Sequence, residues 1–223
     1  MKTSHVGKYL RMLLLTMAVV LIGGVLVWVG LETSADKGGT VQGILTGAPC
    51  APPCWQGITP GTSMERQEVI RLLKKIPNVD TVWESGAAIR WTWKQWPSEG
   101  TGYNSVYVSW DGVVHDIMLS VDFDLTVEEI LDQYGLPDAT NFVVAGVPEH
   151  AYGAMNMFYP AHGFYCTAEV LPYDKPVLEP ESRIFQVLYL VPADSMEDRF
   201  GSDVNSMDLQ PWPGYGALEV ASP

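Results

Sequence analysis

Apolar residues recur at helical spacing in two separate segments of the chain. In each segment they occupy positions i, i+3, i+4 and i+7, which places them on one face of a helix. The two apolar sets are Val69, Leu72, Leu73 and Ile76, and Val127, Ile130, Leu131 and Tyr134. A hydroxyl residue and a glutamate three positions later, the spacing of an N-terminal capping box, mark the start of each helix. These pairs are Thr62 with Glu65 and Thr126 with Glu129. The pattern predicts two capped amphipathic helices.

The residues after each predicted helix follow the pattern of β-strands. Short runs rich in valine, tyrosine, tryptophan and phenylalanine are separated by turn residues, as in antiparallel sheets. Trp91 and Trp93 alternate with Thr92 and Lys94, so one face of that strand is predicted to be aromatic and the other polar. The Asp-Gly dipeptide at 111–112 is a strong hairpin signal. We therefore expect three or four antiparallel strands after each helix.

These patterns predict an α+β fold class. The chain is expected to begin with an N-terminal transmembrane helix, followed by two similar units. In each unit one helix packs on an antiparallel sheet of three or four strands, and the two units together make a plausible core. The predicted regions are a cytoplasmic stub and transmembrane anchor at 1–31, a flexible stalk at 32–48, the first unit at 49–122, the second unit at 123–192 and an acidic C-terminal tail at 193–223.

The most apolar segment lies near the N-terminus. Met12–Leu31 contains twenty residues without a charge, which matches the hydrocarbon core of a bilayer, roughly 30 Å thick. Basic residues precede this segment and acidic residues dominate the sequence just after it. The chain is therefore predicted to be a single-pass protein of the cell membrane, with a cytoplasmic N-terminus and the bulk of the chain extracytoplasmic. A signal peptide cleaved after Ala35 is the alternative, although the usual apolar core of such a peptide is only about 7–15 residues long.

The charge distribution argues against two classes of partner, nucleic acid and anionic lipid surfaces. All 26 acidic residues follow the predicted anchor, with ten of the 13 basic residues, and the whole chain has a formal net charge of −13. Nucleic acid needs a basic footprint, and so do anionic lipid surfaces. We therefore expect no nucleic-acid partner. The expected partners are the lipid bilayer, through the N-terminal helix, and another protein of the cell envelope.

Cys50 and Cys54 stand in the proline-rich stretch APCAPPCW at the start of the first unit. In an exported domain such a pair is expected to form a disulfide, which would hold Trp55 against the unit. The alternatives are a redox site or a copper site that uses both sulfurs. Redox motifs have two residues between the cysteines, whereas this pair has three. Cys166 lies in an apolar run and is expected to be a buried thiol. We predict no metal site and no cofactor.

Aromatic residues are the remaining candidates for a contact surface. Trp91, Trp93 and Trp96 lie in or beside one predicted strand, where they either belong to the core or offer a protein or glycan contact. Trp212 and Tyr215 lie in the stretch PWPGYG of the tail and either dock onto the domain or form a partner motif. No catalytic residue is assigned, because no nucleophile stands in a recognisable setting and no phosphate-binding glycine loop is present.

A helix that ends near Pro-Asp, an aromatic strand and an Asp-Gly hairpin together resemble the outer-membrane assembly lipoproteins of the BamE/SmpA type. The matching residues are Gly61, Val69, Leu73, Trp91, Trp93, Asp111 and Gly112 in the first unit, and Thr126, Glu129, Ile130, Gly135, Pro137 and Asp138 in the second. Two such units in tandem, over about 58–192, are also similar to the architecture of beta-lactamase inhibitory proteins. The chain departs from the assembly lipoproteins because no lipidation cysteine follows its apolar run.

The resemblance implies a binding or scaffolding role rather than catalysis. The sequence thus predicts a membrane-anchored extracytoplasmic protein that acts as a non-catalytic binding or scaffolding module of the cell envelope. The alternative is a copper-handling or redox protein that uses Cys50 and Cys54.

Overall fold

The structure is a computed structural model of the chain. All the residues that it describes belong to one compact unit, Thr40–Pro223. They are residues 50–94, 104–121, 125–145, 152–172 and 175–218. The predicted cytoplasmic stub, anchor and stalk lie outside these residues, and so does Trp96. Within the described ranges, no helix has both the length and the apolar character that crossing a membrane requires.

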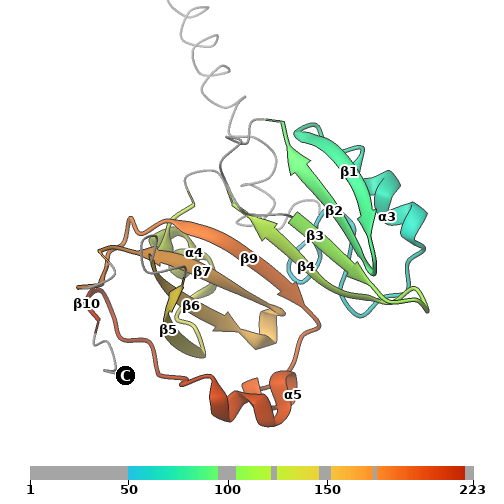
Figure 1. Ribbon diagram of the computed structural model, residues 1–223. Helices are drawn as coiled ribbons and strands as arrows, with labels where there is room; N and C mark the ends of the chain where they lie inside the picture. The colour runs from blue at the N-terminus through green and yellow to red at the C-terminus, as the bar shows by residue number, and fades with distance from the viewer. Residues whose placement is uncertain (1–49, 95–103, 122–124, 146–151, 173–174, 219–223) are drawn as a thin grey trace, which may run out of the picture. The chain divides into compact units, whose positions relative to one another are not determined.

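One antiparallel sheet of eight strands is the centre of the unit (Figure 1). Its strand order is β1-β2-β3-β4-β9-β7-β6-β5, so the first and second halves of the sequence form the two halves of the sheet. The strands are β1 (Val79–Ser85), β2 (Ala88–Trp93), β3 (Asn104–Val108), β4 (Val114–Ser120), β5 (Ala139–Ala145), β6 (Tyr152–Tyr159), β7 (Phe164–Val170) and β9 (Ile184–Leu190). A short pair, β8 (Val177–Leu178) with β10 (Gly216–Ala217), lies outside the large sheet.

The predicted fold class of two helix-on-sheet units is wrong. The described part of the chain is mostly sheet, with three short α-helices, and β4 pairs with β9 along five residues from each strand. This pairing joins the two halves into one continuous sheet. Sequence patterns within each half carry no sign of it, because an edge strand and a central strand can have the same alternation of apolar and polar residues.

Two of the helices contribute to the main core. They are α3 (Arg66–Leu73) and α4 (Val127–Tyr134). Their buried residues are Val69 and Leu73 in α3 and Val127 and Ile130 in α4, as the helical spacing predicts. These side chains pack with alternate residues of the sheet, among them Ile89, Trp91, Val106, Ile117, Val187 and Tyr189. One face of the sheet therefore forms one side of the core, and the two helices pack against it.

The two helices begin differently, although their sequences suggest the same cap. The predicted capping box of α4 is confirmed: the Glu129 N–H donates to Thr126 Oγ1 at 3.3 Å, and the Thr126 N–H donates to Glu129 Oε2 at 3.0 Å. The predicted box of α3 is wrong, because Glu65 is the N-cap and has no side-chain cap bond. Thr62 instead donates to the Thr59 carbonyl at 2.6 Å, and its own carbonyl accepts from the Val114 N–H at 2.9 Å. The strand-like pairing of Thr62 thus prevents it from capping the helix.

The segment after β9 packs on the opposite face of the sheet. It contains α5 (Met196–Phe200) and the 3₁₀ turn η3 (Gly201–Ser206), whereas a second 3₁₀ turn, η2 (Pro160–His162), links β6 to β7. A second apolar cluster joins this segment to the sheet residues Ala139, Phe158 and Tyr165. Its members from the segment are Met196, Phe200, Val204, Met207 and Leu209. The predicted tail is therefore folded against the sheet over its described part.

The chain then crosses the edge of the sheet at β5. Thr140 and Gln210 exchange two backbone hydrogen bonds, at 2.7 and 2.8 Å. Beyond that point Trp212 packs against the main core, on the other side of the sheet from Leu209. The residues 207–218 therefore form a strap around the β5 edge, and β10 fastens its end to β8.

Candidate functional site

The Cys50–Cys54 disulfide is confirmed, with Cα atoms 5.5 Å apart. Trp55 follows it directly, and its backbone exchanges two hydrogen bonds of 2.9 Å with Ile58. This tight turn directs Trp55 into the core, where only 1% of its surface is exposed. The described residues include no group of three histidine, cysteine or acidic side chains that could hold a metal ion. In this arrangement the two sulfurs serve to fix the segment that carries Trp55.

Three tryptophans, Trp55, Trp91 and Trp93, pack against one another next to the disulfide segment. Trp55 stacks on Trp91 with ring centroids 5.4 Å apart, and Trp93 packs edge-on against both rings. The Trp93 indole N–H donates to the Ser120 carbonyl at 3.3 Å. All three side chains are buried. The structure therefore places Trp91 and Trp93 in the core, where neither offers a contact surface.

Cys166 is a free thiol on β7 and is fully buried, as predicted. Burial raises the pKa of this thiol far above its ordinary value. The reactive form of cysteine is the thiolate. Cys166 is therefore an inert part of the core.

Among the described elements, α5 and η3 cover only one half of the outer face of the sheet. A single row of paired residues crosses all eight strands on this face: Ala139, Phe158, Tyr165, Leu188, Met118, Ser105, Arg90 and Trp83. The first three pack against α5 and η3. The other five are only half-buried. We call the outer side of β1–β4 and β9 the open face.

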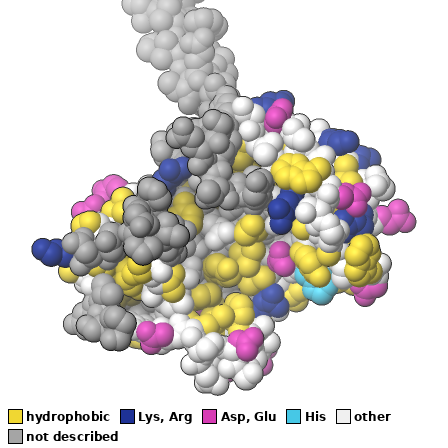
Figure 2. Space-filling view, in the orientation of Figure 1, with side chains coloured by type: hydrophobic (Ala, Val, Ile, Leu, Met, Phe, Trp, Pro, Cys, Tyr) yellow, Lys and Arg dark blue, Asp and Glu magenta, His cyan; other side chains and the backbone are white. Residues whose placement is uncertain are grey.

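The open face is chemically mixed. A second row of pairs places Tyr107, Asp116 and Leu190 side by side across β3, β4 and β9. Tyr107 is 41% exposed, and its ring packs edge-on against that of His115 at 5.3 Å. Figure 2 shows hydrophobic side chains spread over the middle of the molecule in this view, with acidic and basic groups among and around them. Protein–protein interfaces have this composition, but so does the rest of a protein surface, so the mixture alone does not mark an interface.

Trp110 is the most exposed large hydrophobic residue of the described chain, with 85% of its surface accessible. It lies in the β3–β4 hairpin turn at the predicted Asp-Gly signal. The turn is rigid, because the Met64 N–H donates to the Gly112 carbonyl at 2.7 Å and the Ser109 hydroxyl donates to Asp111. Trp110 is not among the candidate contact residues that the sequence pattern indicates. Its place immediately before Asp-Gly could have indicated exposure, because hairpin turns lie at the surface.

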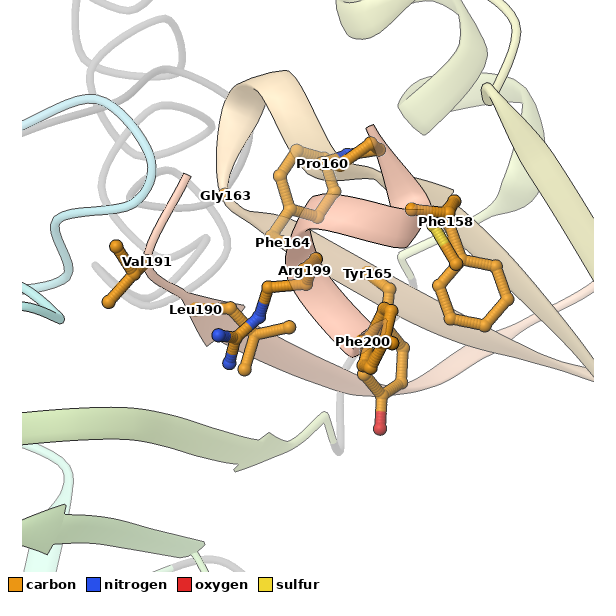
Figure 3. Close-up of a pocket in the computed structure, with 10 residues that line it drawn as sticks. Phe158, Pro160, Gly163, Phe164, Tyr165, Leu190, Val191, Arg199 and Phe200 are labelled. Atoms are coloured by element: carbon orange, nitrogen blue, oxygen red, sulfur yellow. The ribbon is translucent and has the colours of Figure 1, made fainter. Parts of the chain in front are cut away.

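A small hollow opens beside the open face, between α5 and the ends of β7 and β9 (Figure 3). About 210 Å³ of space lies in it when the open solvent at its mouth is counted, and the enclosed part has room for no more than about one water molecule. The walls are mainly apolar, and Arg199 and Tyr165 are the two residues with polar groups at the ends of their side chains. Its lining residues are Phe158, Pro160, Gly163, Phe164, Tyr165, Leu190, Val191, Met196, Arg199 and Phe200.

Arg199 lines this hollow, whereas Asp116, on the neighbouring strand β4, is not among the lining residues. The Arg199 guanidinium lies 5.7 Å from the centre of the Phe200 ring, and Figure 3 shows the side chain running along Leu190. Asp116 is the cross-strand neighbour of Leu190 on the same face. Burial raises the pKa of the Asp116 carboxyl, and the positive charges of His115 and Arg199 act in the opposite direction. Among the described residues, Arg199 and Asp116 form no ion pair.

Trp212 and Tyr215 lie together in the strap, with ring centroids 5.9 Å apart and the planes nearly perpendicular. Trp212 is half-buried against the main core, whereas Tyr215 is 45% exposed. Partial burial raises the pKa of Tyr215, and the nearby carboxylates of Glu128 and Asp132 add to the effect. The structure thus docks Trp212 onto the domain and leaves Tyr215 at its surface.

Comparisons of this chain with protein-family models, with curated proteins and with solved structures found no match. The case for a function therefore depends on the arrangement of the residues described above.

Proposed function

We propose that this protein is a non-catalytic protein-binding module of the cell envelope, tethered to the membrane by the apolar segment Met12–Leu31. The observation that carries the binding role is the exposure of Trp110 on a rigid turn at one end of the open face. We also propose that the chain resembles the BamE/SmpA type and beta-lactamase inhibitory proteins. This resemblance implies the same binding role.

The exposure of Trp110 has an energetic cost in the free protein. A tryptophan side chain offers a large apolar area, and removing it from water contributes roughly 25 cal/mol per Å². Tryptophan is also the residue type most enriched among the few that dominate binding energy at interfaces. Because the turn is already fixed by hydrogen bonds from Met64 and Ser109, little conformational entropy is lost when a partner covers Trp110.

The open face extends the surface that a partner would cover. It includes the exposed Tyr107 together with half-buried Met118 and Leu188. Interface centres favour such aromatic and methionine side chains over lysine and glutamate. A folded protein that places an apolar loop or helix on this face would cover it and Trp110 together.

Site-specific photocrosslinking in the native cell tests the proposal. A photoreactive residue at Tyr107 should give one discrete protein adduct, and the same residue at the exposed Lys75, just after α3 on the core side of the sheet, should give none. Trp110→Ala should reduce the Tyr107 adduct at least several-fold. Leu136→Ala is the matched control, because Leu136 is also strongly exposed, at 68%, but follows α4 rather than the hairpin. Equal adduct yield in the wild type and Trp110→Ala would refute the role of Trp110.

The membrane tether is tested separately. The full chain should stay with membranes during extraction at alkaline pH, and a chain that lacks residues 1–31 should be released. Release of the full chain would refute the membrane anchor. It would not contradict the proposed binding role.

The copper or redox alternative requires Cys50 and Cys54 as free thiols. Intact mass after thiol alkylation, with elemental analysis of the same sample, decides between the two. A closed bond without metal supports the structural role, and one copper per chain, lost in Cys50→Ser, would replace the proposal.

A further inference from the structure

Arg66, the first residue of α3, lies against two hairpins of the sheet. Only 18% of its side chain is exposed. Its Nη1 donates to the carbonyls of Ala87, at 3.0 Å, and Val108, at 3.1 Å, and its Nη2 donates to the Gly86 carbonyl at 3.0 Å. The guanidinium therefore connects the start of α3 to the turn between β1 and β2 and to the end of β3.

The contacts of Arg66 account for all three of its side-chain nitrogens. Nε donates to Glu84 Oε2 at 3.0 Å, and Nη2 lies 2.9 Å from the same oxygen. The N–H groups of a guanidinium form a fixed planar fork. Because this fork is directed at three carbonyls and one carboxylate, it fixes the positions of both hairpins relative to α3.

One of these carbonyls belongs to the turn that carries the exposed tryptophan. Val108 stands two residues before Trp110. On the other side of the turn, the Gly112 carbonyl accepts from the Met64 N–H at 2.7 Å. Met64 lies just before α3 and Arg66 begins it. The turn is therefore held on both sides of Trp110 by the segment that starts one helix.

We propose that Arg66 is a positioning residue for a protein contact made by Trp110. This inference rests on the binding role proposed above. Arg66 does not itself touch the partner, since its nitrogens are already directed at acceptors within the domain. It acts through the backbone of Val108 and keeps the turn in one conformation before the partner arrives. Less conformational entropy is then lost when the complex forms.

The exposure of Trp110 indicates the shape of the partner. Because 85% of its surface is accessible, a flat partner surface against one side of the indole would leave much of the ring in water. Side chains that dominate binding energy are fully desolvated in well-packed pockets. The partner is therefore a folded protein with a concave pocket that takes the indole ring.

Fluorine NMR of the full-length protein labelled with 5-fluorotryptophan tests the positioning role. The chain has eight tryptophans, and the Trp110 resonance is the one that disappears in Trp110→Phe. Arg66→Gln should change the shift and linewidth of this resonance, while those of the buried Trp91 and Trp93 stay as in the wild type. An unchanged Trp110 resonance would overturn the proposal. Changes in all three would show a general structural role and overturn it as well.

Two further variants complete the NMR experiment. Arg71→Gln is the matched control, because Arg71 is an exposed arginine of the same helix that pairs with Glu68, and it should leave the Trp110 resonance unchanged. Arg66→Lys keeps the charge but lacks the fork. It should change the Trp110 resonance in the same direction as Arg66→Gln, and it provides the test if Arg66→Gln does not fold.

Photocrosslinking from Tyr107 in the native cell tests the consequence for binding. Arg66→Gln should lower the adduct yield per chain several-fold, as Trp110→Ala does, and Arg71→Gln should leave it unchanged. Loss of the adduct in Trp110→Ala but not in Arg66→Gln would overturn the positioning role and leave the proposed function intact. Equal yields in the wild type and Trp110→Ala would refute the binding role of Trp110, and the positioning role would fail with it.

Discussion

Trp55 stacks on Trp91 with ring centroids 5.4 Å apart and an angle of 16° between the ring planes. The contact joins the disulfide-closed segment, which precedes all regular structure of the described chain, to the second strand of the sheet. Both rings are buried, and Trp93 completes the cluster. The proline-rich segment that carries Cys50, Cys54 and Trp55, which we call the plug, therefore contributes to the core.

The first prediction concerns the plug. Trp55→Ala should lower the free energy of unfolding by about 3–5 kcal/mol, because a large buried aromatic is removed and a cavity remains. Urea unfolding measured by circular dichroism gives the value. Trp110→Ala is the control and should change stability by less than about 0.5 kcal/mol. A similar loss for both variants would contradict the buried stack.

The second prediction concerns the disulfide. The double variant Cys50→Ser, Cys54→Ser should lose about 2 kcal/mol, the value that loop-closure entropy assigns to so short a loop. Because the hydrogen bonds between Trp55 and Ile58 remain, the loss should be smaller than that of Trp55→Ala. Urea midpoints of both variants, measured under the same conditions, make the comparison. A larger loss for the double serine variant would show that the bond does more than restrict the unfolded chain.

The third prediction separates the two threonines of the predicted caps. Thr126→Ala removes the acceptor for the Glu129 N–H and should cost about 1 kcal/mol of unfolding free energy. Thr62→Ala removes only an exposed hydroxyl bond to Thr59 and should cost less than about 0.5 kcal/mol. Thermal unfolding of both variants measures the difference. Equal losses would mean that Thr62 contributes to the start of α3 after all.

The fourth prediction concerns pH. Burial raises the folded-state pKa of Asp116, so the native protein holds this proton more tightly than the unfolded chain does. The stabilisation is complete below the ordinary aspartate pKa of about 3.9 and is lost as pH rises through the folded-state pKa. Asp116→Asn should therefore be more stable than the wild type at pH 7, with a difference that shrinks toward pH 3. A constant difference across this range would contradict the raised pKa.

The fifth prediction concerns the strap over the β5 edge. Thr140 directs its N–H and C=O toward Gln210, and residues Phe142 and Val144 direct theirs to the same side. The strand has no charged residue, and Val144 is half exposed, features that favour edge-to-edge pairing. A chain that ends at Ser206 should associate in a concentration-dependent way in sedimentation experiments.

A charge on the edge provides the test of that mechanism. Val144→Lys in the shortened chain should restore the monomer, because a lysine on an edge strand opposes pairing. A chain shortened only by residues 219–223 should behave as the wild type. Association that persists with Val144→Lys would show that it occurs through another surface.

The local elements were predictable because their signals are local. The apolar spacing of α3 and α4, the alternation of Trp91 with Thr92 and the Asp-Gly turn depend on residues within a few positions of one another. The failed cap at Thr62 shows the limit. Its backbone is taken by Val114, more than fifty residues away, and no local pattern carries that information.

The candidate sites were less predictable for a related reason. Trp110 and Trp91 belong to the same aromatic-rich region, yet one is exposed and the other buried. Phe164 and Arg199 come from segments far apart in the sequence, and only the packing of α5 on the sheet brings them to one hollow. Neither residue stands in a motif.

The sequence by itself determined the disulfide partners, the two amphipathic helices, the aromatic face of β2 and the hairpin at Asp111, because each follows from spacing along the chain. Only the tertiary structure decided that both halves share one eight-stranded sheet, that the tail straps the β5 edge and that no described helix covers the outer side of β1–β4. The physical reason is that backbone hydrogen bonds between distant strands are the same for every sequence. Which strands meet is therefore decided by how the whole set of apolar faces can be buried at once.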